Sequence, residues 1–273
     1  YDFLFYFSDG SVPFMFGRKN VLHFQVPFKN VLDGKWNKFK LLTIDYIVCN
    51  SEFTKKTIIH IANDKIKVVY PPIDIDKFLP KTKENIILSV GRFSQLLQSK
   101  KQDVLVEAFK SADKKKIKGW KLIFAGGAEV GGKEFLEKLK KEAVNFPIEI
   151  IENPPFQKLS ELYSRAKIFW VASGYEVDEE INPEKVEHFG MTTVEAMASG
   201  CVPIAQKKGG QKEIIENGVD GYLWTKTDEL LNLTYGLIED ENKLTDLGEM
   251  AIKKSKLFSK EKFSDKIYNL IEQ

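Results

Sequence analysis

One segment of the chain places two carboxylates around what the sequence predicts to be the start of a helix. In EHFGMTTVEAMASG, Glu187 and Glu195 stand eight positions apart, and Gly190 precedes a run of strong helix formers. Amides such as those of Met191 and Thr192 lack partners within such a helix, so a diphosphate would fit there. Glu195 could accept hydrogen bonds from a ribose diol, and Glu187 from hydroxyls of a second sugar-like group. Taken alone, a solvated glutamate pair beside an amphipathic helix is an equally good interpretation.

A second segment, GRFSQLLQSKKQDVLVEAF, offers positive charge at the end of a predicted strand. Gly91 and Arg92 close the strand, and Lys100 and Lys101 precede a helix that should begin near Asp103. Parallel α/β sheets bind ligands at the carboxyl ends of their strands, so Arg92 and Lys100 could together neutralise two phosphates. An isolated lysine pair is more often a solvated surface feature. The presence of both segments in one lobe favours an anion site.

The elements that must position these residues alternate strand with helix, which predicts parallel sheets wrapped by helices. A first set of strands is expected at 3–8, 20–26, 45–51 and 66–72, with a helix over 52–62 that Ser51 caps. A second set is expected at 85–91, 120–127, 148–152, 168–173, 201–206 and 221–225, with helices between the strands and a helical tail from 228 onward.

Domain limits follow from a segment bounded by prolines, 71–80, that can continue neither a helix nor a central strand. The predicted fold class is α/β with two Rossmann-like lobes. Residues 1–80 form a partial N-terminal lobe with the linker, 81–255 a complete C-terminal lobe, and 256–273 a terminal helix. The chain begins without an initiator methionine and is interpreted as a fragment whose N-terminal lobe is incomplete.

Composition narrows the class of protein. The chain has 273 residues, 43% of them hydrophobic and 29% charged, with a formal net charge of +2. No apolar run approaches the roughly 18 residues of a membrane-spanning helix, and the near-neutral charge gives no reason to expect nucleic acid as a partner. Cys49 and Cys201 lie in apolar stretches typical of buried thiols, which favours a reducing cytoplasm. We therefore expect a cytoplasmic protein that could touch the inner face of a membrane peripherally.

Two competing motifs point elsewhere and are rejected. AGGAEVGG follows a predicted strand as a dinucleotide fingerprint would, but Ala128 replaces its middle glycine, so a nicotinamide enzyme is not expected. Asp74 and Asp76 form a D-x-D pattern, yet they fall in the proline-bounded linker. No metal and no cofactor are predicted, because Arg92, Lys100 and helix-start amides would supply the positive potential that a leaving diphosphate needs.

These segments together resemble the family-four retaining glycosyltransferases of the GT-B fold. The resemblance covers nearly the whole chain: NSEFTKKTI and KVVYPPIDIDKF at the end of one lobe, and VGRF, KKQDVLVEAF, KLIFAGG, EHFGMTTVEAMASGCVPIA and GGQKEIIENGVDGYLW in the other. It implies a donor cleft between the lobes and a C-terminal helix that packs back toward the N-terminal lobe.

The resemblance also implies roles for individual residues. Arg92 and Lys100 would contact the donor diphosphate, and Glu195 the ribose. Glu187, with the backbone of Phe189, Gly190 and Met191, would hold the transferred sugar, and Thr192 would lie at the same donor site.

Two further placements are implied. His23, in VLHFQVP, would face the donor sugar across the cleft, although a core histidine beside a strand is an equal alternative. The loop 153–157, with Asn153 and Phe156, would line the base pocket.

The activity implied is transfer of a hexose of mannose or glucose type from a nucleoside diphosphate sugar to a glycan or lipid-linked acceptor, with retention of configuration. Two other functions stay open: a non-catalytic module that binds nucleotide sugars, and a glycoside hydrolase that uses Glu187 and Glu195 as an acid and base pair. The acidic stretch before Glu187, GYEVDEEINPEKV, is expected to be solvated, with an acceptor-facing loop as the alternative.

Overall fold

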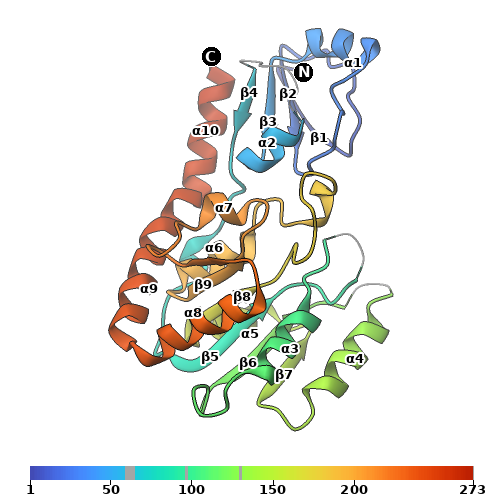
Figure 1. The fold of residues 1–273 in the computed structure, drawn as a ribbon. Coiled ribbons are helices and arrows are strands. Elements are labelled where there is room, and N and C mark those ends of the chain that lie inside the picture. Colours follow the sequence, from blue (N-terminus) through green and yellow to red (C-terminus); the bar gives the residue numbers. More distant parts are fainter. Residues whose placement is uncertain (59–64, 96–97, 129–130, 273) are drawn as a thin grey trace.

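The protein is described by a computed structural model over residues 1–58, 65–95, 98–128 and 131–272. Its strands form two sheets, and every strand pairing within them is parallel. Helices lie beside both sheets, and the two sheets follow one another along the long direction of the molecule (Figure 1). The predicted alternation of strands and helices in two α/β units is therefore confirmed.

The first sheet has the order β1-β2-β3-β4 and is built from short, mainly apolar strands. Its strands are β1 Phe3–Ser8, β2 Lys19–Phe24, β3 Tyr46–Cys49 and β4 Ile66–Val68. Alternate residues point to opposite faces: Leu22 and Ile47 lie in one apolar cluster, whereas Val21 and Val48 lie in another. Both faces of this sheet are therefore covered.

Short helices connect the strands of the first sheet. They are α1 Lys35–Lys40, the 3₁₀ turn η1 Leu41–Thr43 and α2 Glu52–Ile58. Ser51 caps α2 as predicted, because its Oγ accepts a hydrogen bond from the Thr54 amide at 3.0 Å. The helix was expected to reach residue 62, but residues 59–62 lie outside the described part of the chain.

The second sheet has the order β10-β9-β8-β5-β6-β7. Its strands are β5 Glu84–Val90, β6 Lys121–Gly126, β7 Ile148–Glu152, β8 Ala166–Val171, β9 Val202–Gln206 and β10 Tyr222–Trp224. The chain starts at β5, winds outward through β6 and β7, and then returns to β8 on the other side of β5. Such a reversal opens a crevice between the loops that leave the carboxyl ends of β5 and β8. The fold thus predicts where a ligand would bind.

Helices cover both faces of the second sheet. They are α3 Gln102–Ser111, α4 Lys133–Ala143, α5 Phe156–Arg165, α6 Met191–Ala198, α7 Gln211–Ile214 and α8 Thr227–Glu239, with the 3₁₀ turn η3 Pro183–Lys185 before α6. Ile87 and Trp170 belong to the core on one face, and Leu88 and Phe169 to the core on the other. Cys49 and Cys201 are both buried free thiols, as expected.

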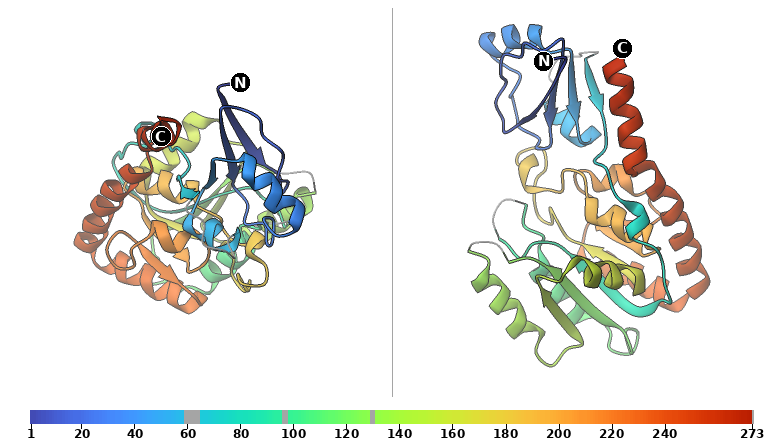
Figure 2. Two further views of the ribbon diagram at one scale, coloured as in Figure 1. Left: turned by 90° about the horizontal axis from the view of Figure 1, so that it is seen from above. Right: turned by 180° about the vertical axis from the view of Figure 1, so that it is seen from behind.

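The C-terminal helices bring the end of the chain back to the first sheet. After α9 Glu241–Ser255 and the turn η4 Lys256–Phe258, α10 Lys260–Glu272 runs beside β4, as Figure 1 and the right view of Figure 2 show. Leu270 joins the apolar cluster that contains Val21 and Val48. The predicted return of the terminal helix to the N-terminal lobe is confirmed, whereas the exact domain limits at 80 and 255 remain predictions.

The linker between the sheets contains the turn η2 Ile75–Lys77 and is held in place by the C-terminal helices. The Ile73 amide donates to the Phe258 carbonyl at 3.0 Å, and the Lys260 amide donates to the Ile73 carbonyl at 3.2 Å.

Among the described residues, no helix has both the length and the apolar character that a bilayer crossing demands.

Candidate functional site

The two segments that the sequence singled out meet at the carboxyl edge of the second sheet. Lys100 lies in the loop that follows β5, and Glu187 lies in the loop that follows β8. The Lys100 Nζ donates to Glu187 Oε2 at 2.7 Å, and the two side chains are only 18% and 13% exposed. A cation and a carboxylate 87 residues apart therefore form a nearly buried pair in the crevice that the strand order predicts.

The charge state of this pair follows from its surroundings. Burial raises the pKa of Glu187, but the Lys100 ammonium, His188 and the Ser173 hydroxyl lower it, and the net effect is a pKa below its ordinary value. Glu187 is therefore ionised at neutral pH and accepts hydrogen bonds rather than donating them. An ionised, immobilised carboxylate suits the binding of hydroxyl groups.

Glycines allow the loops at this edge to approach one another closely. A Cβ on Gly209 would lie 2.0 Å from the Glu187 carbonyl oxygen, and Gly209 adopts a φ of +53°. A Cβ on Gly126 would lie 2.0 Å from the carbonyl oxygen of Gly91. Gly126 belongs to the motif that resembled a dinucleotide fingerprint, and its role here is close packing of β6 against the end of β5.

Helix α6 presents its N-terminal end beside Glu187. Gly190 has a φ of +121°, and its carbonyl accepts from the amides of Thr193 and Val194, which begins the helix. The amides of Met191 and Thr192 lie in the first turn, where no carbonyl of the same helix can reach them. The predicted helix start after Gly190 is confirmed, and it forms an electropositive end suited to an anion.

Glu195 lies one turn inside α6 and is held by a partner that sequence reasoning missed. The Tyr163 hydroxyl donates to Glu195 Oε2 at 2.8 Å. Burial raises the pKa of Glu195 to about 7, although the Tyr163 hydrogen bond acts in the opposite direction. Tyr163 comes from α5, is fully buried, and carries no sequence signal that distinguishes it from a core aromatic residue.

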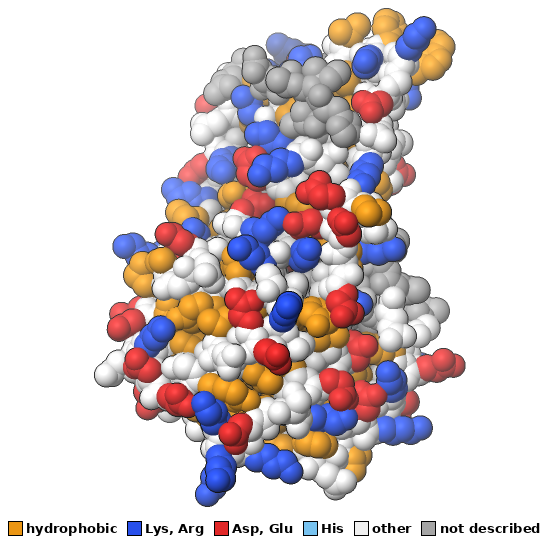
Figure 3. Space-filling model, viewed as in Figure 1, with side chains coloured by type: hydrophobic (Ala, Val, Ile, Leu, Met, Phe, Trp, Pro, Cys, Tyr) orange, Lys and Arg blue, Asp and Glu red, His pale blue; other side chains and the backbone are white. Residues whose placement is uncertain are grey.

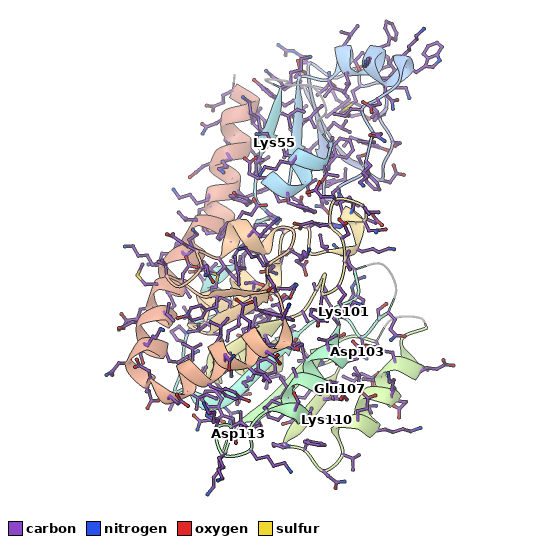
Figure 4. The ribbon with its side chains drawn as sticks, in the orientation of Figure 1. Lys55, Lys101, Asp103, Glu107, Lys110 and Asp113 are labelled. Atoms are coloured by element: carbon purple, nitrogen blue, oxygen red, sulfur yellow. The ribbon has the colours of Figure 1, made fainter. Side chains whose placement is uncertain are left out.

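Arg92 and Lys101 occupy the same edge of the sheet. Arg92 is exposed, and its carbonyl accepts from Gln102 Nε2 at 2.9 Å, which ties the end of β5 to the start of α3. Figure 4 shows Lys101 at the end of α3 nearer the first sheet and Asp113 at the far end. Arg92 after β5 and the lysines before α3 therefore lie at one edge of the sheet, and contact of their side chains with a donor diphosphate remains a prediction.

His23 lies in the first sheet with its ring out of contact with solvent. It is 4% exposed, and its ring centroid lies 5.4 Å from that of Phe5 and 5.0 Å from that of Phe7. Within the described residues neither ring nitrogen has a hydrogen-bond partner. Burial lowers the pKa of His23 to about 4, so the imidazole is neutral. This position matches the alternative of a core histidine, and a role at the donor remains a prediction.

The other residues predicted for the donor site are Phe189, Asn153 and Phe156. The Phe189 side chain is buried and stacks on Tyr70, with ring centroids 5.5 Å apart, so only its backbone can face the crevice. Asn153 follows β7, and its backbone N–H donates to the Gly126 carbonyl at 2.8 Å. Phe156 begins α5 and is 53% exposed. These two share the carboxyl edge of the sheet but lie two strands away from β5.

The acidic stretch before Glu187 is a folded connection between the sheets. The Glu179 carboxylate accepts from the Gly209 amide and from Lys212 Nζ, both at 2.6 Å. Lys29, from the loop after β2, donates to the carbonyl oxygens of Glu180 and Ile181. The expectation that this acidic run is solvated is wrong for Glu179, because its carboxylate is bonded to Gly209 and Lys212 from another part of the chain.

A second bridge joins the two sheets through α2. The Glu213 carboxylate accepts from the amides of Glu52 at 2.8 Å and Phe53 at 3.0 Å, at the open end of that helix. Burial raises the pKa of Glu213, although these amide bonds act to lower it. Sequence reasoning did not assign Glu213 a role, since its partners Glu52 and Phe53 lie 161 and 160 residues away.

Asp74, of the D-x-D pattern, has structural partners. Its carboxylate lies 3.0 Å from Lys77 Nζ and 3.2 Å from Lys260 Nζ, away from the crevice. Over the described ranges, no three His, Cys, Asp or Glu side chains come together in a way that could hold a metal ion.

Comparison with known proteins identifies the family. The family model described as glycosyl transferases group 1 matches residues 72–254, which include both halves of the crevice. The chain belongs to the glycosyl transferases group 1 family. The mixed α/β architecture with two parallel sheets is the GT-B fold of this family.

Relatives of this chain include mannosyltransferases. The GDP-Man:Man(3)GlcNAc(2)-PP-Dol alpha-1,2-mannosyltransferase of Xenopus laevis is 30% identical over 219 residues, which cover 70% of this chain and 42% of that protein. An alpha-1,3/1,6-mannosyltransferase of Neurospora crassa is 26% identical and covers 87% of this chain and 58% of its own length. The chain thus spans about two fifths of the Xenopus protein.

Among solved structures, the Anabaena protein Alr3699/HepE in complex with UDP has a TM-score of 0.77. It is 19% identical in sequence, and the match covers 93% of this chain and 72% of that chain. At this identity the likeness supports the fold alone.

Proposed function

We propose that the chain contributes the donor site of an enzyme that transfers a hexose, of mannose or glucose type, from a nucleoside diphosphate sugar to a glycan or lipid-linked acceptor. The observation that carries the proposal is the Lys100–Glu187 pair beside the open end of α6, in the crevice between β5 and β8. A diphosphate and the sugar attached to it need cationic and hydroxyl-binding groups side by side, and this crevice supplies both.

The diphosphate would lie against Arg92, Lys100 and the first amides of α6. As the bond from the anomeric carbon to the diphosphate breaks, negative charge grows on the leaving oxygen. Fixed cations and amide dipoles stabilise that charge without reorganising. These groups can supply the required positive potential, so we propose a reaction that needs no metal ion.

The two glutamates would bind different parts of the donor. Glu195, oriented by Tyr163, would accept hydrogen bonds from the ribose hydroxyls. Glu187, ionised beside Lys100, would accept hydrogen bonds from the transferred sugar. We propose that the acceptor hydroxyl attacks from the face that the diphosphate leaves, which retains the anomeric configuration.

The names of the relatives support the choice of sugar and acceptor. The Xenopus protein is named for a GDP-mannose donor and an acceptor on a dolichol diphosphate, and the Neurospora protein is named a mannosyltransferase. We therefore propose a mannose-type donor first, a lipid-linked or free glycan acceptor, and a location in the cytoplasm at the inner face of a membrane.

Turnover of labelled GDP-mannose and UDP-glucose by the full-length protein tests the proposal, with NMR used to read the anomeric configuration of the product. We expect glycosyl transfer with retention. Inversion would refute the stereochemical part, and release of free sugar from a simple glycoside would support a hydrolase instead. Binding of the donor by calorimetry without any turnover would support a binding module. Arg92→Ala should abolish that binding, whereas Lys253→Ala, at an exposed position on α9, should leave it unchanged.

A further inference from the structure

A pocket lies at the edge of the second sheet opposite to the crevice, and its volume is about 720 Å³. It opens between the amino ends of β5 and β6, the last turn of α3 and the loop before β7. In Figure 4, Lys101 marks the end of α3 near the crevice, whereas Lys110 and Asp113 mark the end near this pocket. Pockets that hold small organic ligands commonly measure about 300–1,000 Å³. We call this cavity, lined from the segments 84–86, 109–121 and 145–147, the amino-edge pocket.

Apolar side chains form the floor of the amino-edge pocket. Phe109, Ile117 and Trp120 line it and belong at the same time to the hydrophobic core of the second sheet. The loop that carries two of them is held by its own hydrogen bonds. The Trp120 amide donates to the Ile117 carbonyl at 3.0 Å, and the Ile117 amide donates to the Asp113 carbonyl at 3.1 Å. This apolar floor is therefore preformed, and a ligand can lie on it without reordering the loop.

Lysines outnumber acidic residues around the amino-edge pocket. Among its described lining residues one, Glu84, is acidic, and its carboxylate is paired with the guanidinium of Arg165. Four others are lysines: Lys110, Lys114, Lys118 and Lys121. Figure 3 shows Lys or Arg side chains next to hydrophobic ones at the lower end of the molecule, where this end of α3 lies in Figure 1. The pocket thus combines an apolar floor with a positively charged rim.

Two of these lysines are available to a ligand. Lys110 Nζ lies 2.6 Å from Glu107 Oε1, and Lys121 Nζ lies 3.8 Å from Glu149 Oε2, so both already have acidic neighbours. Lys114 and Lys118 are exposed, and within the described part of the chain neither forms an ion pair. An anionic group that enters the pocket therefore meets ammonium groups whose charge no carboxylate of the described residues has compensated.

We propose that the amino-edge pocket is a second ligand site that takes a small organic anion. An apolar ring or chain of the ligand would lie on Phe109 and Trp120, and its carboxylate, sulfonate or phosphate group would face Lys114 and Lys118. Removal of apolar surface from water supplies affinity, and the lysines select for negative charge. An uncharged sugar fits this floor less well, because hydroxyl groups held against apolar side chains lose hydrogen bonds to water. The site lies outside the donor crevice, so the proposal does not depend on the proposed transferase function.

Two dyes with the same ring system test the proposal on the full-length protein. Anilinonaphthalene sulfonate carries one negative charge, whereas phenylnaphthylamine carries none, and both fluoresce more strongly on an apolar surface. GDP and UDP are kept in excess so that nucleotide competes for the donor crevice. We expect the sulfonate dye to bind at least about tenfold more tightly than the neutral dye, because its charge is attracted by lysines at the rim of a partly enclosed pocket.

Charge reversal locates the anionic group. Lys114→Glu with Lys118→Glu should weaken binding of the sulfonate dye by about tenfold or more and leave binding of the neutral dye unchanged. Lys253→Glu with Lys256→Glu makes the same change in net charge at exposed positions of α9 and η4. This control variant should bind both dyes as the unaltered protein does.

Energy transfer from tryptophan locates the ring system. Excitation of Trp120, in the floor of the pocket, should sensitise the emission of the bound dye. Trp120→Phe keeps an aromatic floor and should lower that sensitised emission. Trp36, on α1, is 75% exposed and belongs to the first sheet, so Trp36→Phe should leave the sensitised emission unchanged.

Three results would overturn the proposal. The first is equal affinity for the two dyes, or equal loss of affinity in the two charge-reversed variants. The second is displacement of the sulfonate dye by GDP or UDP, which would place the dye in the donor crevice. The third is loss of sensitised emission in Trp36→Phe but not in Trp120→Phe, which would place the dye on the first sheet.

Discussion

Replacing Lys100 with methionine tests whether the ion pair in the crevice is as tightly coupled as its geometry indicates. Methionine keeps an aliphatic stem where Lys100 packs against Gly91, and it removes only the ammonium group. Loss of one partner from a fully buried pair costs about 3–5 kcal/mol, because the remaining charge is left without compensation. The side chains here are 18% and 13% exposed, so solvent screens part of that cost. We expect the free energy of unfolding to fall by about 2–3 kcal/mol at pH 7.

Urea denaturation of the chain measures this loss, and a second pair provides the control. Lys140 lies 2.8 Å from Glu137, but the side chains are 41% and 61% exposed. Lys140→Met should therefore change the free energy of unfolding by no more than about 0.5–1 kcal/mol. In a double-mutant cycle with Glu187→Gln, the coupling between Lys100 and Glu187 should be about 2 kcal/mol.

The pH dependence of the same variant gives an independent check. In the unaltered protein the pKa of Glu187 lies below its unfolded value of 4.5. The resulting stability is present above pH 4.5 and is lost as the pH falls through the folded pKa. In Lys100→Met, burial is the largest remaining influence on the pKa of Glu187, so this pKa should rise above 4.5. Protonation of Glu187 at acid pH should then remove the buried charge that destabilises the variant. The stability difference should shrink below about pH 4.5. A difference that is independent of pH, or smaller than about 0.5 kcal/mol at pH 7, would refute the reasoning.

Two further changes test the surroundings of the pair. The folded pKa of Glu195, about 7, exceeds its unfolded value of 4.5, so its contribution to stability is present below pH 4.5 and is lost as the pH rises through 7. Glu195→Gln should therefore be more stable than the unaltered protein by about 1–3 kcal/mol at pH 8, and similarly stable at pH 4. Thermal unfolding at the two pH values measures this difference. Equal stability of the two proteins at both pH values would contradict the prediction. Gly209→Ala places a Cβ 2.0 Å from the Glu187 carbonyl oxygen and should lower both stability and donor affinity in calorimetry. Gly119→Ala is the matched control, because Gly119 also has a positive φ but a Cβ there would meet nothing within 4 Å. It should lower the free energy of unfolding by only about 1–2 kcal/mol and leave donor affinity unchanged. Equal effects of the two substitutions would count against close packing at Gly209.

The location of the candidate site could be predicted because it depends on local features. A strand that ends at Val90, a glycine before a run of helix formers at Gly190, and lysines before α3 are each readable within a few residues. Parallel strands place their carboxyl ends at one edge, so local assignments were enough to bring Lys100 and Glu187 to the same side of the sheet.

The partners of those residues could not be predicted. Tyr163 on Glu195, Lys29 on the acidic stretch, and Glu213 on the end of α2 are all contacts between distant parts of the chain. A tyrosine in a helix or a glutamate in an acidic run has the same sequence appearance whether it is solvated or bonded. Only the path of the backbone decides between the two.

What the sequence by itself determined is therefore the succession of elements and the chemistry available at their ends. Periodicity, glycine and capping residues act through neighbours in the chain, and their physical effect is complete within one or two turns or one strand. The tertiary structure alone decided that Glu179 is bonded, that Tyr163 holds Glu195, and that Glu213 binds the first amides of α2. Those outcomes depend on burial and on charges brought together from remote positions, and both arise only when the chain is folded.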